Sequence, residues 1–414
     1  MSDNKIQFSP EAQRFAIEME EAKQDVKVPE LFSRTGSPRE KIDEICILRR
    51  WNSHTPSLLN VWGGGYFIRW HNHGTIIDPG CSFIRVFQSE IPYEVGDVDM
   101  IISTHDHVDH CQDLGTLISL LREYNKWLDK QNKPPRTWDL LMSHGVANQF
   151  NSPLIHPDNS PFLRWNRVLS LDDVEQVQPL PLITREKTRS GMSGWKKHIS
   201  AYTFFCQKTI AQDYKYQLQL LPTKHKELLG SRTAFGLKFK LKPGGKTIII
   251  SGDTGFDDKV NLADYYKNAH LLILHVGTME NTVGERLKDH LGLDGVTKIL
   301  AGIKRSKPKL VVLTEWGYEF GRIPEPGNLG HRIRFTKLVE ERLQTMKIKS
   351  YYAPVSNNQI MKKIPIIPAD IGLRISLPDL NVWSEDENNG KGGFIPPDRI
   401  WVEDKGEELH FHTI

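Results

Sequence analysis

The densest group of potential metal ligands in the sequence is the stretch STHDHVDH, from Ser103 to His110. Three histidines and two aspartates stand within six consecutive positions. Four of these side chains form the candidate ligand set: His105, His107, Asp109 and His110. Four donors are more than one tetrahedral ion needs from a single loop, so the stretch predicts two adjacent metal ions. A chance surface cluster is the alternative, and four metal-binding side chains at the end of an apolar strand argue against it.

The elements around this stretch place it on a loop between a strand and a helix. The segment DMIIST (99–104) has the apolar character of a strand. The segment CQDLGTLISLL that follows has Leu114, Leu117, Ile118 and Leu121 at helical spacing.

Further along the chain, short apolar runs and turn residues alternate with helical patterns. LKFKLK and KTIIIS, joined by Pro-Gly-Gly, predict a hairpin, and AHLLILHVG and PKLVVLTEWG predict buried strands. Helices are predicted over residues 9–25, from Asp294 onward and over residues 333–347. Strands that lead into helices, mixed with hairpins, predict an α/β protein whose helices cover its sheets.

Composition excludes few functions. The 414 residues are enough for one large domain or two ordinary ones, and the net charge of +3 favours no particular partner. The four cysteines are far apart and show no C-x-x-C pair, which predicts a reduced, cytoplasmic protein. The N-terminus has no hydrophobic signal core, and no apolar run is long enough to cross a membrane, so no membrane partner is expected.

The stretch THDHVDH resembles the H-x-H-x-D-H motif of the metallo-β-lactamase fold superfamily. The segment GGGYFIRWHNHGTIIDPGCSF is similar to the early hairpin of that superfamily. IIISGDTGF resembles its later strand with the bridging aspartate, here Asp253, and PTKHKELLGSRTAFGLKFKL resembles the segment with its third histidine, here His225. The resemblance covers residues 45–355 and is strongest to the ribonuclease Z-like branch of metal-dependent hydrolases.

This resemblance implies a fold and a domain organisation. The fold is an α/β, four-layer αβ/βα sandwich with N- and C-terminal extensions and with metals at the open edge between its sheets. It implies an N-terminal helical extension over 1–44, a hydrolase domain over 45–355 and a C-terminal extension over 356–414 that packs on the domain. The region 151–224 is an irregular insertion in that domain.

The resemblance also implies two divalent metal ions and their ligands. The first ion is bound by His105, His107 and His225, the second by Asp109, His110 and Glu315, and Asp253 bridges the two.

One ligand position departs from the pattern of the superfamily. Its last ligand is a histidine at the end of the late strand, and Glu315 stands there in LVVLTEWG. A carboxylate can bind a divalent metal, and it raises the prospects of Mn²⁺ or Fe²⁺ beside Zn²⁺, the expected ion. Two alternatives to Glu315 as a ligand remain. The second site is weakened or empty, or His275 or His144 supplies a replacement ligand.

The implied activity is a phosphodiesterase or nuclease that uses a dinuclear site and metal-activated water. Asp109 would accept or orient the proton of the water, and His290, in a segment similar to a histidine-bearing loop of the branch, would assist the leaving oxygen. His290 as an ordinary surface histidine is the alternative. The competing functions are a metallohydrolase of a small carbonyl substrate such as a lactone, and a non-catalytic binding subunit with an altered second metal site.

A basic segment suggests a nucleic acid or nucleotide phosphodiester as substrate. Arg189, Trp195 and Lys196 are the candidate substrate-binding residues, since cations can follow a phosphate backbone and an aromatic ring can stack on a base. Solvated loops with an incidental tryptophan are the alternative. The glycine- and proline-rich arm of some ribonuclease Z enzymes is not found in the sequence. The terminal extensions are candidate docking sites for a second copy of the chain or a protein partner.

Overall fold

The structure is a computed structural model. It describes residues 9–10, 14–15, 17–18, 40–52, 64–150, 163–169, 180–187, 193–200, 216–225, 234–256, 261–279, 289–303, 307–321, 328–346, 352–354, 364–384, 392–405 and 408–413. Within the predicted N-terminal helix, residues 10, 14, 15, 17 and 18 are helical. None of the helices in the described part of the chain has the length and apolarity that a membrane span needs.

A nine-stranded sheet, in the order β18-β17-β16-β1-β2-β3-β4-β5-β6, forms one half of the molecule. Its strands are β1 (Glu44–Ile47), β2 (Tyr66–Trp70), β3 (His73–Ile77), β4 (Met100–Ser103), β5 (Trp138–Ser143), β6 (Leu163–Leu169), β16 (Leu373–Ser376), β17 (Val382–Ser384) and β18 (Gly393–Ile395). The helices of this half are α4 (Phe83–Glu90), α5 (Val108–Cys111), α6 (Leu114–Lys130) and α7 (His144–Gln149).

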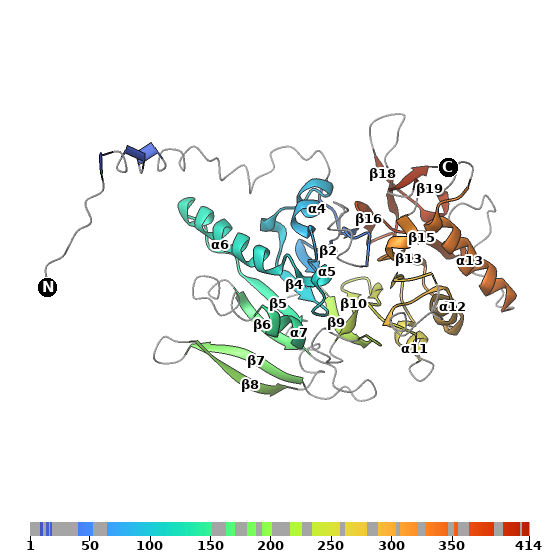
Figure 1. The fold of residues 1–414 in the computed structure, drawn as a ribbon, viewed down its shortest axis with the longest axis horizontal. Coiled ribbons are helices and arrows are strands. Elements are labelled where there is room, and N and C mark those ends of the chain that lie inside the picture. The colour runs from blue at the N-terminus through green and yellow to red at the C-terminus, as the bar shows by residue number, and fades with distance from the viewer. Residues whose placement is uncertain are drawn as a thin grey trace.

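A seven-stranded sheet, in the order β14-β15-β13-β12-β11-β10-β9, forms the other half (Figure 1). Its strands are β9 (Tyr216–Pro222), β10 (Phe235–Leu241), β11 (Thr247–Ile250), β12 (Leu271–His275), β13 (Leu310–Thr314), β14 (Tyr352–Pro354) and β15 (Ile364–Pro368). The helices of this half are α11 (Leu262–Tyr266), α12 (Leu293–Gly302) and α13 (His331–Thr345). The predicted hairpin is present as β10 and β11, and the two predicted late helices are α12 and α13.

Three clusters of buried apolar side chains lie between the layers. One lies between the sheets and draws on both, for example Ile45 of β1 and Leu237 of β10. The second joins the seven-stranded sheet to α11, α12 and α13, and the third joins the nine-stranded sheet to α4 and α6. Alternation along β1 sends Ile45 and Ile47 to the inner cluster and Cys46 to the outer one. Two sheets packed together and covered by helices on their outer faces confirm the predicted four-layer sandwich.

Two hairpins form small sheets of their own. The strands β7 (Leu180–Lys187) and β8 (Ser193–Ser200) form a two-stranded sheet within the insertion, at one margin of the molecule (Figure 1). The strands β19 (Ile400–Asp404) and β20 (Leu409–Thr413) form another near the C-terminal end of the described chain. Short 3₁₀ helices cover Val95–Asp97, Tyr318–Gly321 and Pro397–Arg399.

The region predicted as a C-terminal extension supplies strands to both main sheets. β15 belongs to the seven-stranded sheet, and β16, β17 and β18 belong to the nine-stranded sheet. β16 lies antiparallel beside β1, where Arg374 donates to both carboxylate oxygens of Glu44 at 2.7 Å. The domain boundaries and the docking role of the extensions remain predictions.

Candidate metal centre

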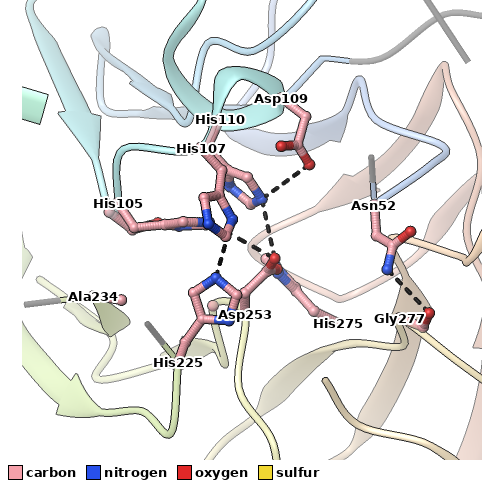
Figure 2. Close-up of polar contacts among 12 residues, drawn as sticks. Asn52, His105, His107, Asp109, His110, His225, Ala234, Asp253, His275 and Gly277 are labelled. Atoms are coloured by element: carbon pink, nitrogen blue, oxygen red, sulfur yellow. Dashed lines mark hydrogen bonds and ion pairs between the residues drawn. The ribbon is translucent and has the colours of Figure 1, made fainter. Parts of the chain in front are cut away.

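The candidate ligands lie at the ends of strands that meet at one edge of the sandwich. His105 and His107 follow β4, and α5 begins immediately after them. His225 follows β9, Asp253 follows β11 and Glu315 follows β13. Because β11, β12 and β13 are parallel neighbours, their carboxyl ends share one edge of the sheet. The side chains converge there from both sheets, as Figure 2 shows for the histidines and Asp253.

Four side chains make up what we call the first position: His105, His107, His225 and Asp253. One donor atom from each lies within 4.8 Å of the others. Nε2 of His225 is 3.1 Å from Nδ1 of His107, and Nε2 of His105 is 3.7 Å from Oδ2 of Asp253. Three imidazole nitrogens and one carboxylate are a donor set suited to a tetrahedral divalent ion.

Four side chains make up the second position: Asp109, His110, Asp253 and Glu315. Three of them, His110, Asp253 and Glu315, form a group of donors as compact as the first. Nε2 of His110 lies 3.3 Å from Oδ2 of Asp253, and 3.5 Å from both Oε2 of Glu315 and Oδ2 of Asp109. Asp253 is common to both positions, as a bridging ligand requires.

The two positions contain buried polar atoms that lack hydrogen-bond partners. Among the described residues, these include His105 Nε2, His110 Nε2, Asp253 Oδ2 and Glu315 Oε2. A buried polar atom without a partner is costly, and four that converge on one place fit bound cations. The residues present therefore fit the metal ions that the motif implies.

The histidines of the first position are held neutral. Burial lowers the pKa of His105 well below its usual value, and His110 lowers it further. Burial also lowers the pKa of His107 and of His225. A neutral imidazole presents the lone pair that a metal ion needs.

At the second position, the charges of His110 and of the neighbouring carboxylates shift one another's pKa values. Burial and Arg49 lower the pKa of His110, but Asp253 and Glu315 outweigh them and raise it well above its usual value. Burial raises the pKa of Asp253, but His110 outweighs it and the pKa falls well below its usual range. Burial raises the pKa of Glu315 in spite of Arg49 and His275.

Contacts behind the ligands fix their orientation. Asp78 accepts from the backbone N–H of Thr104 at 2.7 Å and from its hydroxyl at 2.8 Å, and it lies 3.0 Å from Nδ1 of His110. Nδ1 of His225 is 3.1 Å from the carbonyl of Asp289. In His110 and His225 these contacts occupy Nδ1, so that Nε2 is the ring nitrogen that faces the centre. Asp78, His105 and His110 also form a compact group of possible ligands, in which Asp78 already has these partners.

Sequence reasoning missed two residues that contact the second position, Arg49 and Tyr66. Nη2 of Arg49 donates to Oδ2 of Asp109 at 2.6 Å, and Nε lies 3.2 Å from Oε1 of Glu315. The Tyr66 hydroxyl donates to Oε1 of Glu315 at 3.2 Å. The available signal was the arginine pair in ICILRRW, where charge follows a buried strand directly.

His275, weighed as a replacement ligand, has partners on both ring nitrogens. Its Nδ1 is 2.9 Å from Oδ1 of Asp253 and 3.0 Å from Oε1 of Glu315, and its Nε2 is 2.8 Å from the Tyr66 hydroxyl. It belongs to none of the compact ligand groups among the described residues. The geometry thus places His275 behind the carboxylates and leaves Glu315 at the second position.

The remaining candidate residues are His290, Trp195, Lys196 and Arg189. Nδ1 of His290 is 3.7 Å from Oδ2 of Asp253, and its side chain is 21% exposed, which places it at the rim. Trp195 and Lys196 lie in β8, where the register sets Trp195 opposite Arg185 of β7. Arg189 lies outside the described residues.

Comparison with solved structures bears on the fold. A long form of RNase Z from yeast aligns over 84% of this chain and 43% of its own, with 13% identity and a TM-score of 0.50. Yeast PDE1 aligns over 82% of this chain and all of its own, with 10% identity and a TM-score of 0.50. YhfI from Bacillus subtilis, a metallo-β-lactamase fold protein, aligns over 81% of this chain and 99% of its own, with 14% identity and a TM-score of 0.49.

This chain shares its two-sheet sandwich fold with the yeast RNase Z and with yeast PDE1. At these identities the likeness shows the fold alone. No family model and no curated protein sequence matches the chain. In this sandwich, the candidate centre lies at the edge where the ends of β4, β9, β11 and β13 meet.

Proposed function

We propose that this protein is a divalent-metal-dependent phosphodiesterase that acts on nucleic acid or nucleotides through a two-metal site. The observation that carries the proposal is the set of buried, unpartnered donor atoms on His105, His110, Asp253 and Glu315. They converge on two overlapping positions that share Asp253. The likeness in fold to an RNase Z and to PDE1 supports a phosphodiester over a lactone as the substrate.

The proposed ligands follow the two positions. His105, His107 and His225 would hold one ion, Asp109, His110 and Glu315 the other, and Asp253 would bridge. Bound divalent ions would activate water near neutral pH and offset negative charge on a phosphodiester. Zn²⁺ is the expected ion, and the carboxylate of Glu315 makes Mn²⁺ or Fe²⁺ a suitable alternative.

Two side chains would handle protons. Asp109, held by Arg49 at 2.6 Å, presents its Oδ2 toward the centre and would orient the attacking water. His290 stands at the rim, partly exposed, where it would donate a proton to the leaving oxygen. The β7–β8 hairpin, with Trp195 and Lys196, would contact the nucleic acid beyond the reacting phosphate.

Metal analysis combined with an assay panel tests the proposal. The purified protein should contain bound transition metal and should hydrolyse bis-p-nitrophenyl phosphate and labelled nucleic acids when Mn²⁺ or Zn²⁺ is supplied. The His105→Ala, His107→Ala double variant should lose the metal and the activity together. Turnover of a lactone or thioester without phosphodiester cleavage would overturn the substrate assignment. No turnover on any substrate by the metal-loaded protein would indicate a binding subunit instead.

The two positions should differ in how pH affects metal binding. The pKa values of His105, His107 and His225 are lowered, so these ligands stay neutral at least until the pH falls below about 6.5. The pKa of His110 is raised, so a metal ion at the second position must displace its proton near neutral pH. We therefore expect the second ion to be lost first as the pH is lowered from about 8 to about 6. Equilibrium dialysis followed by metal analysis checks this, and simultaneous loss of both ions would contradict it.

A further inference from the structure

The two carboxylate oxygens of Glu315 have opposite surroundings. Oε1 lies 3.2 Å from Nε of Arg49 and 3.0 Å from Nδ1 of His275, and it accepts from the Tyr66 hydroxyl at 3.2 Å. Oε2 is buried, has no hydrogen-bond partner among the described residues and lies 3.5 Å from Nε2 of His110. A carboxylate anchored through one oxygen and bare at the other is oriented to bind a cation through the bare oxygen.

Arg49 reaches both carboxylates on this side of the centre. Its side chain is fully buried, with Nη2 donating to Oδ2 of Asp109 at 2.6 Å and Nε next to Glu315. Nε and Nη1 also donate to the carbonyls of Trp51 and Gly64, each at 3.3 Å. The guanidinium is therefore fixed by the backbone, donates a hydrogen bond to Asp109 and lies at ion-pair distance from Glu315.

Backbone pairing brings Arg49 to Glu315. Trp51 and Trp316 form a parallel bridge, in which the N–H of Trp316 donates to the carbonyl of Arg50 at 2.9 Å. Glu315 has a φ of 57°, a left-handed conformation that is unfavourable for a residue with a Cβ. The conformation persists where surrounding contacts impose it, and such residues cluster at functional sites.

Arg49 offsets the negative charge that Glu315 adds to this group. Asp109, Asp253 and Glu315 bring three negative charges to the second position. A neutral histidine in place of Glu315, as the resemblance leads one to expect, would leave two. Arg49 adds one positive charge in direct contact with Glu315, so the excess charge of the carboxylate is cancelled inside the protein.

We propose that Arg49 and Glu315 form a charge-compensated unit that takes the place of a histidine ligand. Glu315 binds the second metal ion through Oε2, and Arg49 is the positioning residue that holds Glu315 and cancels its added charge. This inference rests on the two-metal site proposed above. In this arrangement Arg49 acts on the metal centre through Glu315 and does not itself bind a metal ion.

The first test measures the rise in Tm that Mn²⁺ produces in wild type, in Arg49→Met and in the control Arg374→Met. Without Arg49 the three carboxylates repel one another in the metal-free protein, and Mn²⁺ relieves that repulsion. We expect Arg49→Met to lower the Tm of the metal-free protein more than that of the loaded protein, so its Mn²⁺-induced rise exceeds that of wild type. Arg374 is an equally buried arginine that pairs with Glu44, away from the centre. Its variant should lose the same amount of Tm in both states.

The second test asks whether a histidine can replace the unit as a whole. Glu315→His leaves Arg49 buried beside the second ion with only one carboxylate partner, so we expect affinity at the second position to fall at least about tenfold. Adding Arg49→Met to Glu315→His removes the uncompensated charge and should restore both the second ion and the Tm. Metal content after dialysis against Mn²⁺, measured by mass spectrometry, provides the readout.

The outcomes separate this inference from the proposed function. A wild-type protein without bound metal or Mn²⁺-induced rise in Tm would overturn the two-metal site and this inference with it. A wild-type rise that Arg49→Met leaves unchanged would overturn this inference alone, as would a double variant no better than Glu315→His. A wild-type protein with one ion, and a second ion gained in Arg49→Met, would show that the guanidinium occupies the second position.

Discussion

Asp253→Ala is expected to remove both metal ions and to lower phosphodiesterase activity by about 10³-fold or more. Metal ions contribute several kcal/mol of transition-state stabilisation, and each ~1.4 kcal/mol lost lowers the rate tenfold. Asp253 contributes to both positions, and its Oδ2 lies 3.3 Å from His110 and 3.7 Å from His105. No other candidate ligand belongs to both groups. Metal content per chain and kcat/KM in the presence of Mn²⁺ measure the effect.

Two further variants sharpen this experiment. Asp253→Asn keeps the shape of the side chain and removes its charge, so a comparable loss would assign the effect to the carboxylate. Asp106→Asn is the control, because Asp106 is a buried aspartate in the loop of His105 and His107 but belongs to none of the compact ligand groups among the described residues. It should retain both ions. Two ions retained in Asp253→Ala would contradict the bridging role.

Asp370→Ala is expected to lower the free energy of unfolding by about 3–5 kcal/mol, the usual cost of breaking a buried ion pair. Asp370 accepts from Nε of Arg50 and, at 3.1 Å, from Nη1 of Arg332. It also accepts from the backbone N–H of Leu409 at 2.8 Å, which ties β20 to the sandwich. The substitution leaves two buried guanidinium groups without this partner. Urea unfolding of the metal-free wild-type and variant proteins measures this difference in the free energy of unfolding.

A matched control lies on the same C-terminal hairpin. The Lys405–Glu403 pair has its atoms 3.5 Å apart and both side chains largely exposed to solvent. Lys405→Ala should therefore change the free energy of unfolding by no more than about 0.5 kcal/mol. A loss below about 1 kcal/mol in Asp370→Ala would show that Arg332 keeps its charge compensated through Asp404 alone, at 3.0 Å.

Much of the fold could be predicted because its signals are local. The β10–β11 hairpin, the strand before STHDHVDH and the helices α12 and α13 each follow from residues within one segment. Strand order could not be predicted in the same way. β1 lies between β2 and β16, and the latter is more than three hundred residues away in the sequence. Apolar patterning shows that β1 is buried on both faces but does not specify the strand beside it.

The difference between local and long-range signals also explains which residues of the candidate site could be predicted. The motif around His105 placed several donors on one loop. The resemblance of later segments to the superfamily indicated His225 and Asp253, and the position at a strand end indicated Glu315. Arg49 could not be predicted as part of the site. Its position beside Glu315 depends on a bridge between Trp51 and Trp316, which no local sequence pattern encodes. The spacing of apolar residues predicts which side chains are buried, but it does not predict which buried charged side chains form ion pairs with one another.

The pairing of β1 with β16 also has a consequence during synthesis. β1 leaves the ribosome long before β16, so one edge of it has no strand beside it while most of the chain is made. Exposed strand edges promote aggregation in incompletely folded chains, and a charged side chain on the edge opposes it. Glu44 of β1 would supply such a charge until β16 pairs with β1 and Arg374 reaches the carboxylate that it contacts in the folded protein. The same carboxylate would thus protect the nascent edge first and stabilise the finished sheet afterwards.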